Sequence, residues 1–249
     1  MTVARAAEAL GRPDEAARYR ALHARIAADF CRHFQDPTTR GLRHHGSPQC
    51  ANALALNAEL VTPADRPLLV EDLIADLEQR GGQQTPGDVG HVHFIRALAQ
   101  AGRSDVLHRV YSRDGTGSYG GILAKGLTSM PETWDAMMDG YQSLNHCMLG
   151  HVMEWYYGYV GGIRQTPGGV GWRELLMAPN PGPLTHAETV VETPKGRVTS
   201  RWRIEGQTFR LDTEIPAGVK AVAILPSGAQ KPLRAGKRTT LKEAVPQRE

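Results

Sequence analysis

The sequence predicts an α+β protein of two successive domains, a helical one followed by a small antiparallel β domain. Apolar residues recur at spacings of three and four through the first two thirds of the 249-residue chain, which is typical of amphipathic helices. Later they alternate with polar residues, as in strands that bury one face. A run rich in Gly and Pro at 165–169 separates the two patterns, so we expect domains at residues 1–165 and 166–249.

The helical region contains short connections with recognisable helix ends. Arg12-Pro13-Asp14 separates the first two expected helices, and Gly81-Gly82 ends the fourth. The expected helices cover residues 3–10, 14–34, 50–59, 66–80, 89–101, 104–112 and 144–160, the last of them apolar and largely buried. A Gly-rich, non-helical stretch from Arg113 to Tyr141 is the longest expected loop. Long loops inside a compact domain are often functional, so we look for a site there.

The second region contains strand and turn signals. Residues 198–204 and 208–213 alternate in polarity, and Glu205-Gly206 between them predicts a tight hairpin turn. Residues 191–196 contain a second turn signal, and residues 219–225 form a further apolar strand. These short strands indicate a small antiparallel β domain.

Composition and charge are those of a globular protein. The 29 Lys and Arg residues against 26 Asp and Glu give a formal charge of +3, which is too even for a dedicated nucleic-acid surface. No apolar run is long enough for a membrane span or a signal peptide, so we expect no nucleic acid, no membrane and, by default, a cytoplasmic location. Cations gather between Lys231 and Arg248, where we expect a solvated or frayed end, with an RNA or phosphate patch as the alternative.

Cysteine and histidine spacing argues against a bound metal. Cys31, Cys50 and Cys147 are an odd number without a C-x-x-C pair, so we expect reduced thiols. The pairs His91 with His93 and His44 with His45 lack a supporting carboxylate or cysteine. We therefore favour ordinary polar histidines over metal ligands. Nucleotide-binding, zinc-protease and serine-hydrolase motifs are also absent from the sequence, so we expect no cofactor.

The densest group of reactive and aromatic side chains is Glu132-Thr133-Trp134-Asp135, followed by Ser143-Leu144-Asn145-His146. A carboxylate beside a Trp is typical of carbohydrate sites, because apolar sugar faces stack on indole and a carboxylate activates water. The alternative is a helix-capping Glu132 and a packing Trp134. The residue types alone favour that simpler interpretation.

Several short motifs, taken in order, resemble the C-terminal part of bacterial α-L-rhamnosidases of glycoside hydrolase family 78. The resemblance runs from about residue 3 to residue 226, in the family's order and approximate spacing. The motifs are Thr85 to Gly90 (TPGDVG), Ser118 to Gly120 (SYG), Glu132 to Asp135 (ETWD), Ser143 to His146 (SLNH), Gly150 with Glu154-Trp155, Met177 to Pro179 (MAP) and Val191 to Gly196 (VETPKG).

The resemblance implies helical hairpins of a partial (α/α)6 toroid followed by a C-terminal β-sandwich. It also implies inverting hydrolysis of terminal α-L-rhamnosides, with a rhamnoside or related carbohydrate as the ligand. Glu132 matches the position of the general base, and Trp134, Asp135, His146 and Asp88 are then candidates for substrate binding. Glu154 and Trp155 match structural positions.

The resemblance also indicates a missing group. The family's general acid lies a few hundred residues before the base, whereas 131 residues precede Glu132 here. Pro131 is a further departure, because it restricts the backbone of Met130. We therefore expect little or no activity from this chain alone, and a homodimer or a complementing chain that covers the open half-toroid. A non-catalytic carbohydrate-binding or scaffolding module, one subunit of a split glycosidase and an incomplete reading frame stay open as alternatives.

Overall fold

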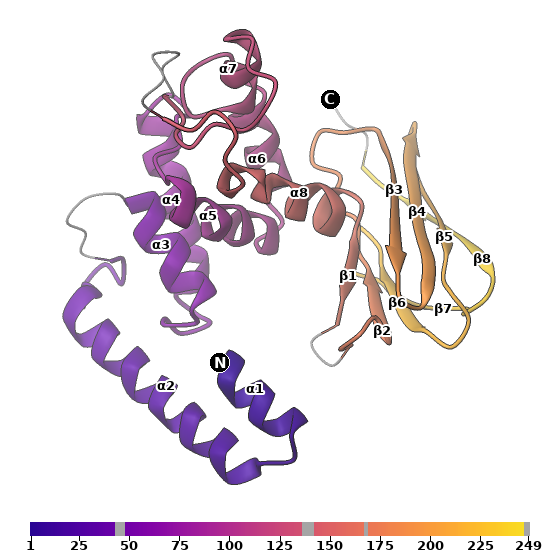
Figure 1. The fold of residues 1–249 in the computed structure, drawn as a ribbon, viewed down its shortest axis with the longest axis horizontal. Helices are drawn as coiled ribbons and strands as arrows, with labels where there is room; N and C mark the ends of the chain where they lie inside the picture. Colours follow the sequence, from indigo (N-terminus) through magenta and orange to yellow (C-terminus); the bar gives the residue numbers. More distant parts are fainter. Residues whose placement is uncertain (43–47, 136–141, 167–168, 247–249) are drawn as a thin grey trace. The chain divides into compact units, whose positions relative to one another are not determined.

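The chain folds into a helical unit and a sheet-containing unit, as the computed structural model shows (Figure 1). The structure describes residues 1–42, 48–135, 142–166 and 169–246. The helical unit comprises residues 1–101 and 110–149, and the sheet-containing unit comprises residues 102–109 and 150–249. This arrangement confirms the predicted fold class of helical hairpins followed by a small β domain.

Six predicted helices are present, with ends within two residues of the prediction. They are α1 (Thr2–Ala9), α2 (Pro13–Phe34), α3 (Pro48–Asn57), α4 (Arg66–Gln79), α5 (Asp88–Gln100) and α6 (Ser104–Tyr111). The core of the helical unit lies where α3 packs on α4 and α5. Leu69, Leu73 and Leu77 of α4 are each fully buried at intervals of four residues, so one face of this helix supplies the core.

Two elements differ from the prediction. The stretch from 113 to 141, expected to be non-helical, contains α7 (Tyr119–Ala124). The single buried helix expected at 144–160 is instead a 3₁₀ turn (Met148–His151), a short α8 (Val152–Trp155) and the π-helical turn η2 (Tyr156–Val160). Gly150 and Gly158 in this stretch weaken a regular helix, and Met153, Tyr156 and Tyr157 are exposed rather than buried.

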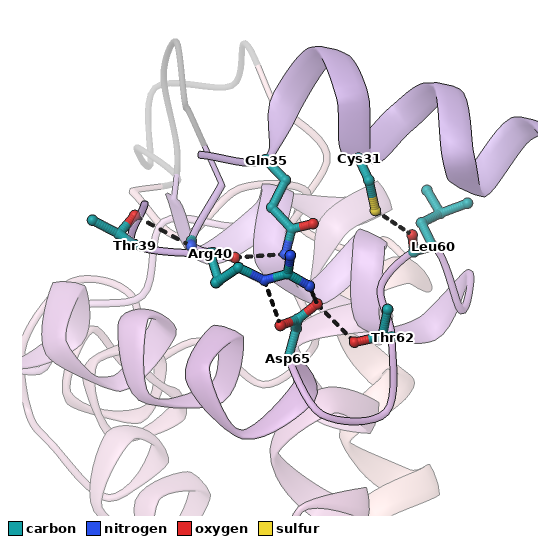
Figure 2. A network of polar contacts seen from close by, with 8 residues as sticks. Cys31, Gln35, Thr39, Arg40, Leu60, Thr62 and Asp65 are labelled. Atoms are coloured by element: carbon teal, nitrogen blue, oxygen red, sulfur yellow. Dashed lines mark hydrogen bonds and ion pairs between the residues drawn. The ribbon is translucent and has the colours of Figure 1, made fainter. Parts of the chain in front are cut away.

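The segment after α2 is fixed by an ion pair between Arg40 and Asp65 (Figure 2). Arg40 Nε and Nη2 donate to the two carboxylate oxygens at 3.0 and 2.7 Å, and the Thr62 hydroxyl adds a third bond at 2.7 Å. These bonds hold the pKa of Asp65 well below its usual range. Arg40 has a φ of 64°, a conformation that costs free energy for a residue with a Cβ, so the bidentate bond offsets local strain.

Neighbouring side chains extend this network. Gln35 Nε2 donates to the backbone oxygen of Arg40 at 2.7 Å, and the Cys31 thiol donates to the oxygen of Leu60 at 3.2 Å (Figure 2). Burial and the negative charge of Asp65 raise the pKa of the Cys31 thiol, which is therefore protonated at neutral pH. The loop that follows α2 is thus tied to the helix and to the loop before α4.

The sheet-containing unit has two four-stranded sheets among the described residues. The first has the order β1 (Ile163–Gln165), β2 (Glu174–Met177), β6 (Lys220–Ile224) and β7 (Gln230–Leu233). The second has the order β3 (His186–Thr193), β4 (Gly196–Glu205), β5 (Thr208–Glu214) and β8 (Arg238–Ala244). Neighbouring strands are antiparallel except β2 and β6, which run parallel. The predicted hairpin between residues 198 and 213 is confirmed, with Gly206 at a φ of 56° in its turn.

Tryptophans anchor the irregular helical turns to this unit. Trp202 of β4 is 2% exposed, and its indole Nε1 donates to the oxygen of Val160 at 2.7 Å. Trp155 is equally buried and donates to the Ser104 hydroxyl at 3.0 Å. Both indole donors are therefore satisfied within the unit, as buried polar groups require.

Residues 230–233 and 238–244 of the basic end are paired in strands rather than frayed. Residues 238–244 form β8, which pairs with β5 along its whole length, and residues 230–233 form β7. Exposed and half-buried residues alternate in β8, and Leu241 lies opposite Leu211 of β5. One face of this edge strand therefore packs on the sheet, while its charged side chains discourage pairing with another chain. In the described part of the chain, none of the helices has the length and apolar character required to cross a membrane.

Candidate active site

A cavity of about 470 Å³ in the helical unit is the strongest candidate site. Its size lies in the range of small-molecule pockets, about 300 to 1,000 Å³. Its walls come from three stretches that are distant in sequence. The lining residues are Gln83, Gln84, Thr85, Gly87, Asp88, Thr116, Glu132, Thr133, Trp134 and Asp135.

Glu132 is half-buried at this cavity and is held by the segment that follows. Its amide donates to the oxygen of Ser143 at 2.8 Å, and the amide of Ser143 donates to Glu132 Oε2 at 3.2 Å. One carboxylate oxygen is thereby oriented by a backbone donor. This reciprocal contact joins the two motifs that sequence analysis singled out, the one at 132–135 and the one at 143–146.

His146 contributes through its backbone and does not line the cavity. Its amide donates to the oxygen of Met130 at 2.7 Å, two residues before Glu132. The hydroxyl of Ser129 donates to the oxygen of Leu144, in line with this pairing. The structure therefore brings His146 close to the segment that carries Glu132, while its ring is half-buried outside the cavity lining.

Trp134 joins the cavity to a buried aromatic cluster. It is 9% exposed, and its Nε1 donates to the oxygen of Pro86 at 2.9 Å. Its ring makes edge-to-face contacts with His91 at 5.1 Å and with Tyr119 at 5.4 Å between centroids. Such aromatic contacts favour one fixed ring orientation. Trp134 is thus both a packing residue, as the simpler interpretation held, and a wall of the cavity.

The remaining members of the cluster were not identified as site residues from the sequence. His91 is fully buried, and its Nε2 lies 2.9 Å from the Tyr111 hydroxyl. Tyr111 and Tyr119 meet edge to face, with 4.9 Å between ring centroids. The spacing of apolar residues in α5 and α6 predicts that these helices bury one face, but it does not predict these contacts, which join positions far apart in the chain.

Asp88 and Asp135 place two more carboxylates at the cavity. Asp88 is the first residue of α5, where its Oδ1 accepts from the amide of Val89 at 2.7 Å, and it is half-buried. Asp135 follows Trp134 and is exposed. The structure thus gathers Glu132, Trp134, Asp135 and Asp88 around one cavity. Asp88 precedes Glu132 by 44 residues in the sequence.

Gln84 and Thr116 are lining residues that sequence analysis missed. Gln84 is 1% exposed, and its Nε2 donates to the oxygen of Gly117 at 2.9 Å, which ties two walls of the cavity together. Gly117 has a φ of 79° and lies so close to Gln84 that a Cβ there would be 3.0 Å from the Gln84 backbone oxygen. Gly117 therefore permits a turn that most other residues would strain.

Ser118 fixes the loop that carries Thr116. Its hydroxyl contacts the backbone oxygens of Arg113 and Gly115 at 2.5 and 2.6 Å, and it accepts from the amide of Gly121 at 3.0 Å as the cap of α7. A Cβ at Gly121 would lie 2.2 Å from the oxygen of Gly115. Residues 113–118, the first part of the Gly-rich stretch, therefore form a tightly packed loop at the cavity.

The described residues contain no cluster of three or more His, Cys, Asp or Glu side chains suited to a metal ion. His91 packs on aromatic rings, as described above, rather than standing in such a cluster. The pair His44 and His45 lies outside the described residues. The cavity instead combines three carboxylates, an indole, amides and hydroxyls, which are the groups that bind a polyhydroxylated ring and activate water on it.

Comparisons with known families cover nearly the whole chain. Residues 1–160 match the family model described as the bacterial alpha-L-rhamnosidase 6 hairpin glycosidase domain, and residues 162–240 match the model described as the bacterial alpha-L-rhamnosidase C-terminal domain. The first matched range ends with η2 and the second begins just before β1, at the change from helical to strand pattern.

Individual relatives agree with these matches. An alpha-L-rhamnosidase of Streptomyces avermitilis is 30% identical over 190 residues, covering 73% of this chain and 18% of the relative. One from Formosa agariphila is 26% identical over 239 residues, covering 93% of this chain and 25% of the relative. The chain thus spans a quarter or less of the length of these curated relatives.

Solved structures show the same fold. The Streptomyces avermitilis alpha-L-rhamnosidase complexed with L-rhamnose has a TM-score of 0.80 and 29% identity, covering 90% of this chain and 22% of that chain. The native rhamnosidase from Aspergillus terreus has a TM-score of 0.86 at 23% identity, covering 97% of this chain and 28% of that chain. The second likeness concerns the fold alone.

Proposed function

Because the chain belongs to the bacterial α-L-rhamnosidase family of six-hairpin glycosidases, we propose that the cavity around Glu132 is part of a site that hydrolyses terminal α-L-rhamnosides. The observation that carries the proposal is the meeting of Glu132 with Trp134, Asp135 and Asp88 at one cavity of ligand size. A relative that shares 29% identity is named as a complex with L-rhamnose, which supports this sugar as the ligand.

Glu132 is the general base in this proposal. In an inverting glycosidase, one carboxylic acid protonates the leaving oxygen while a carboxylate on the opposite face removes a proton from the attacking water. The backbone bond to Oε2 of Glu132 holds the carboxylate in one orientation, which suits a group that must meet a water molecule at a fixed place. Asp88 and Asp135 accept hydrogen bonds from sugar hydroxyls. The Trp134 ring contacts an apolar sugar face, because its one polar group, Nε1, is already bonded to the oxygen of Pro86. His146 lies outside the cavity lining, and in this proposal it supports the segment of Glu132 through the bond from its amide to the oxygen of Met130.

The general acid comes from outside this chain in our proposal. Two carboxyl groups about 6.5 to 9.5 Å apart are required for inversion, and proton transfer to the leaving group contributes roughly 10²- to 10⁴-fold. The chain spans a quarter or less of its relatives, and in the family pattern the acid precedes the base by a few hundred residues. We therefore expect little or no hydrolysis of unactivated rhamnosides by this chain alone.

A second copy of the chain or a complementing chain covers the exposed face of α2 in this proposal. Leu22, Ile26 and Phe34 are 38, 48 and 49% exposed along this helix. Leu22 and Ile26 lie one turn apart on the same face of α2, and exposed apolar side chains gathered on one face are characteristic of interaction surfaces. A complementing chain would also be a source of the missing acid, whereas a second copy, which has the same sequence, would have to supply a different carboxyl group.

Size-exclusion chromatography with light scattering, combined with hydrolysis of methyl α-L-rhamnopyranoside in each fraction, tests the proposal, because its leaving group requires protonation. We expect a folded chain with little turnover when monomeric. Turnover that co-elutes with an oligomer and disappears in Glu132→Gln would indicate that a neighbouring subunit supplies the acid. Rapid turnover by a monomer would contradict the missing acid, and turnover unchanged in Glu132→Gln would contradict the base. Rhamnose binding without turnover in every fraction would favour a carbohydrate-binding module instead.

A further inference from the structure

A second cavity, of about 240 Å³, lies within the sheet-containing unit between η2 and β3. Its lining residues are Tyr156, Tyr157, Glu188, Thr189 and Val190. We propose that this cavity is a separate carbohydrate-binding site that holds one neutral sugar ring. None of these residues belongs to the cavity around Glu132, so the inference is independent of the proposed function.

The walls of this cavity are held in place by specific contacts. A Cβ on Gly161 would lie 2.2 Å from the Thr189 hydroxyl oxygen, so only glycine allows η2 to approach β3 this closely. The guanidinium of Arg164 lies 4.4 Å from the Tyr159 ring centroid, and the Trp202 indole binds the oxygen of Val160. A π-helical turn is rare and is often found at functional sites. The site is therefore formed before a ligand arrives, which reduces the free-energy cost of binding.

Two half-exposed tyrosines supply an aromatic surface. Tyr156 and Tyr157 are each 42% exposed, and the Tyr156 ring packs 5.0 Å from that of Trp155. Aromatic faces bind the apolar C–H face of a sugar ring, while the phenol hydroxyls hydrogen-bond at its edge. Burial raises the pKa of the Tyr156 phenol, so this hydroxyl stays protonated and able to donate at neutral pH.

The polar wall selects a neutral ligand. Glu188 Oε1 accepts from Arg201 Nε at 2.8 Å, which offsets part of its charge, and Arg201 Nη1 also lies 4.0 Å from Glu214 Oε1. A quaternary ammonium ion also suits aromatic rings beside a carboxylate, but the carboxylate of Glu188 is already engaged by Arg201 and attracts such an ion less strongly. Vicinal hydroxyls on a sugar match such an acceptor and donor pair. Among the described strands β3 pairs only with β4, so its outer edge offers further backbone donors and acceptors.

Size and chemistry indicate binding rather than hydrolysis. The volume is below the range of about 300 to 1,000 Å³ for drug-sized ligands, which limits the occupant to a small molecule such as one ring. Of the described residues that line the cavity, Glu188 is the one carboxylate, and it is engaged by Arg201. Glycoside hydrolysis requires two carboxyl groups in most families, so this site lacks the machinery for it.

Backbone amide chemical shifts of the full chain test the proposal directly. The chain is titrated with methyl α-L-rhamnopyranoside, with methyl α-D-glucopyranoside and with tetramethylammonium. We expect a sugar to shift the amides of residues 156–161 and 188–191, and tetramethylammonium to leave them unchanged. Tyr157→Ala should weaken sugar binding about two- to tenfold, because it removes one aromatic contact. Tyr19→Ala, which removes a half-buried tyrosine of α2, is the matched control and should bind as the wild type does.

Glu188→Gln keeps the size of the side chain and provides a second variant if Tyr157→Ala fails to fold. It should also weaken sugar binding, because it removes the negative charge that strengthens hydrogen bonds from sugar hydroxyls and that pairs with Arg201. The proposal is overturned if no sugar shifts these amides, if tetramethylammonium shifts them and sugars do not, or if Tyr157→Ala and Glu188→Gln bind as tightly as the wild type.

Discussion

Helices α5 and α2 belong to the same unit and share the same apolar spacing, yet they are stabilised in different ways. Seven of the 13 residues of α5 are buried, including Phe94, Ile95 and Leu98. The 22 residues of α2 bury only Ala16. Most helical stability in proteins comes from packing an apolar face, so α5 is held by the core and α2 mainly by its own propensity and by α1. An apolar stripe therefore predicts a helix but does not show what covers it.

A matched pair of phenylalanine substitutions should give the largest difference between the two helices. Phe94 is fully buried in α5, so Phe94→Ala should cost about 3–5 kcal/mol of unfolding free energy through lost burial and a cavity. Phe34 is 49% exposed at the end of α2, and Phe34→Ala should stay within about 0.5 kcal/mol. Urea denaturation followed by circular dichroism measures both. Similar losses would show that α2 is packed as firmly as α5.

The ion pair after α2 should have the next largest effect. Asp65→Asn removes the carboxylate that accepts from Arg40 and Thr62, and it should cost about 1–3 kcal/mol. The same denaturation experiment measures the loss. Glu71→Gln, an exposed carboxyl of α4, provides the control and should change stability little. A neutral outcome for Asp65→Asn would mean that the strained backbone of Arg40 is held by other contacts.

The low pKa of Asp65 also predicts how stability depends on pH. The folded state binds this proton more weakly than the unfolded chain, so the contribution of the ion pair is complete above the unfolded pKa of about 3.9. It is lost progressively as the pH falls below that value. Denaturation midpoints of the wild type should therefore fall more steeply than those of Asp65→Asn between about pH 5 and pH 2. Parallel curves would contradict the assignment.

The exposed apolar face of α2, which includes Leu22 and Ile26, should affect association more than folding. Ile26→Glu places a charge among exposed apolar side chains, so it should change the free energy of unfolding by less than about 0.5 kcal/mol. It should nevertheless shift an oligomer toward monomer in light scattering, because a charge opposes burial of this face. Ala24→Glu, about 200° around the helix from Ile26, is the control and should leave the oligomer intact. Equal effects would indicate an interface elsewhere.

Local patterns predicted most of the helices and the central hairpin. Leu69, Leu73 and Leu77 mark the buried face of α4, and Gly206 marks the turn between β4 and β5. The short strands β1, β2 and β7 have three or four residues each, too few for a period to be visible. The polar, basic strand β8 resembles a solvated end until its pairing with β5 is known.

Sequence analysis predicted those residues of the candidate site that have reactive or aromatic side chains. Glu132, Trp134 and Asp88 were singled out from motifs, and the structure places all three at one cavity. Gln84 was missed because it acts through a long-range contact, the bond to the oxygen of Gly117, for which the sequence contains no local signal. Thr116 was missed because no local pattern marks it as a lining residue. The position of His146 outside the lining likewise depends on how its segment pairs with Met130.

Hydrolysis of α-L-rhamnosyl fluoride, followed by proton NMR, tests the role of Glu132 most directly. Fluoride leaves without protonation, so a site with a base and no acid should still hydrolyse this substrate, whereas methyl α-L-rhamnopyranoside should be inert. We predict that β-L-rhamnose is the first product and that Glu132→Gln abolishes its formation. Retention of configuration, an unchanged rate in Glu132→Gln, or no hydrolysis of the fluoride by the folded wild-type chain would contradict Glu132 as the general base.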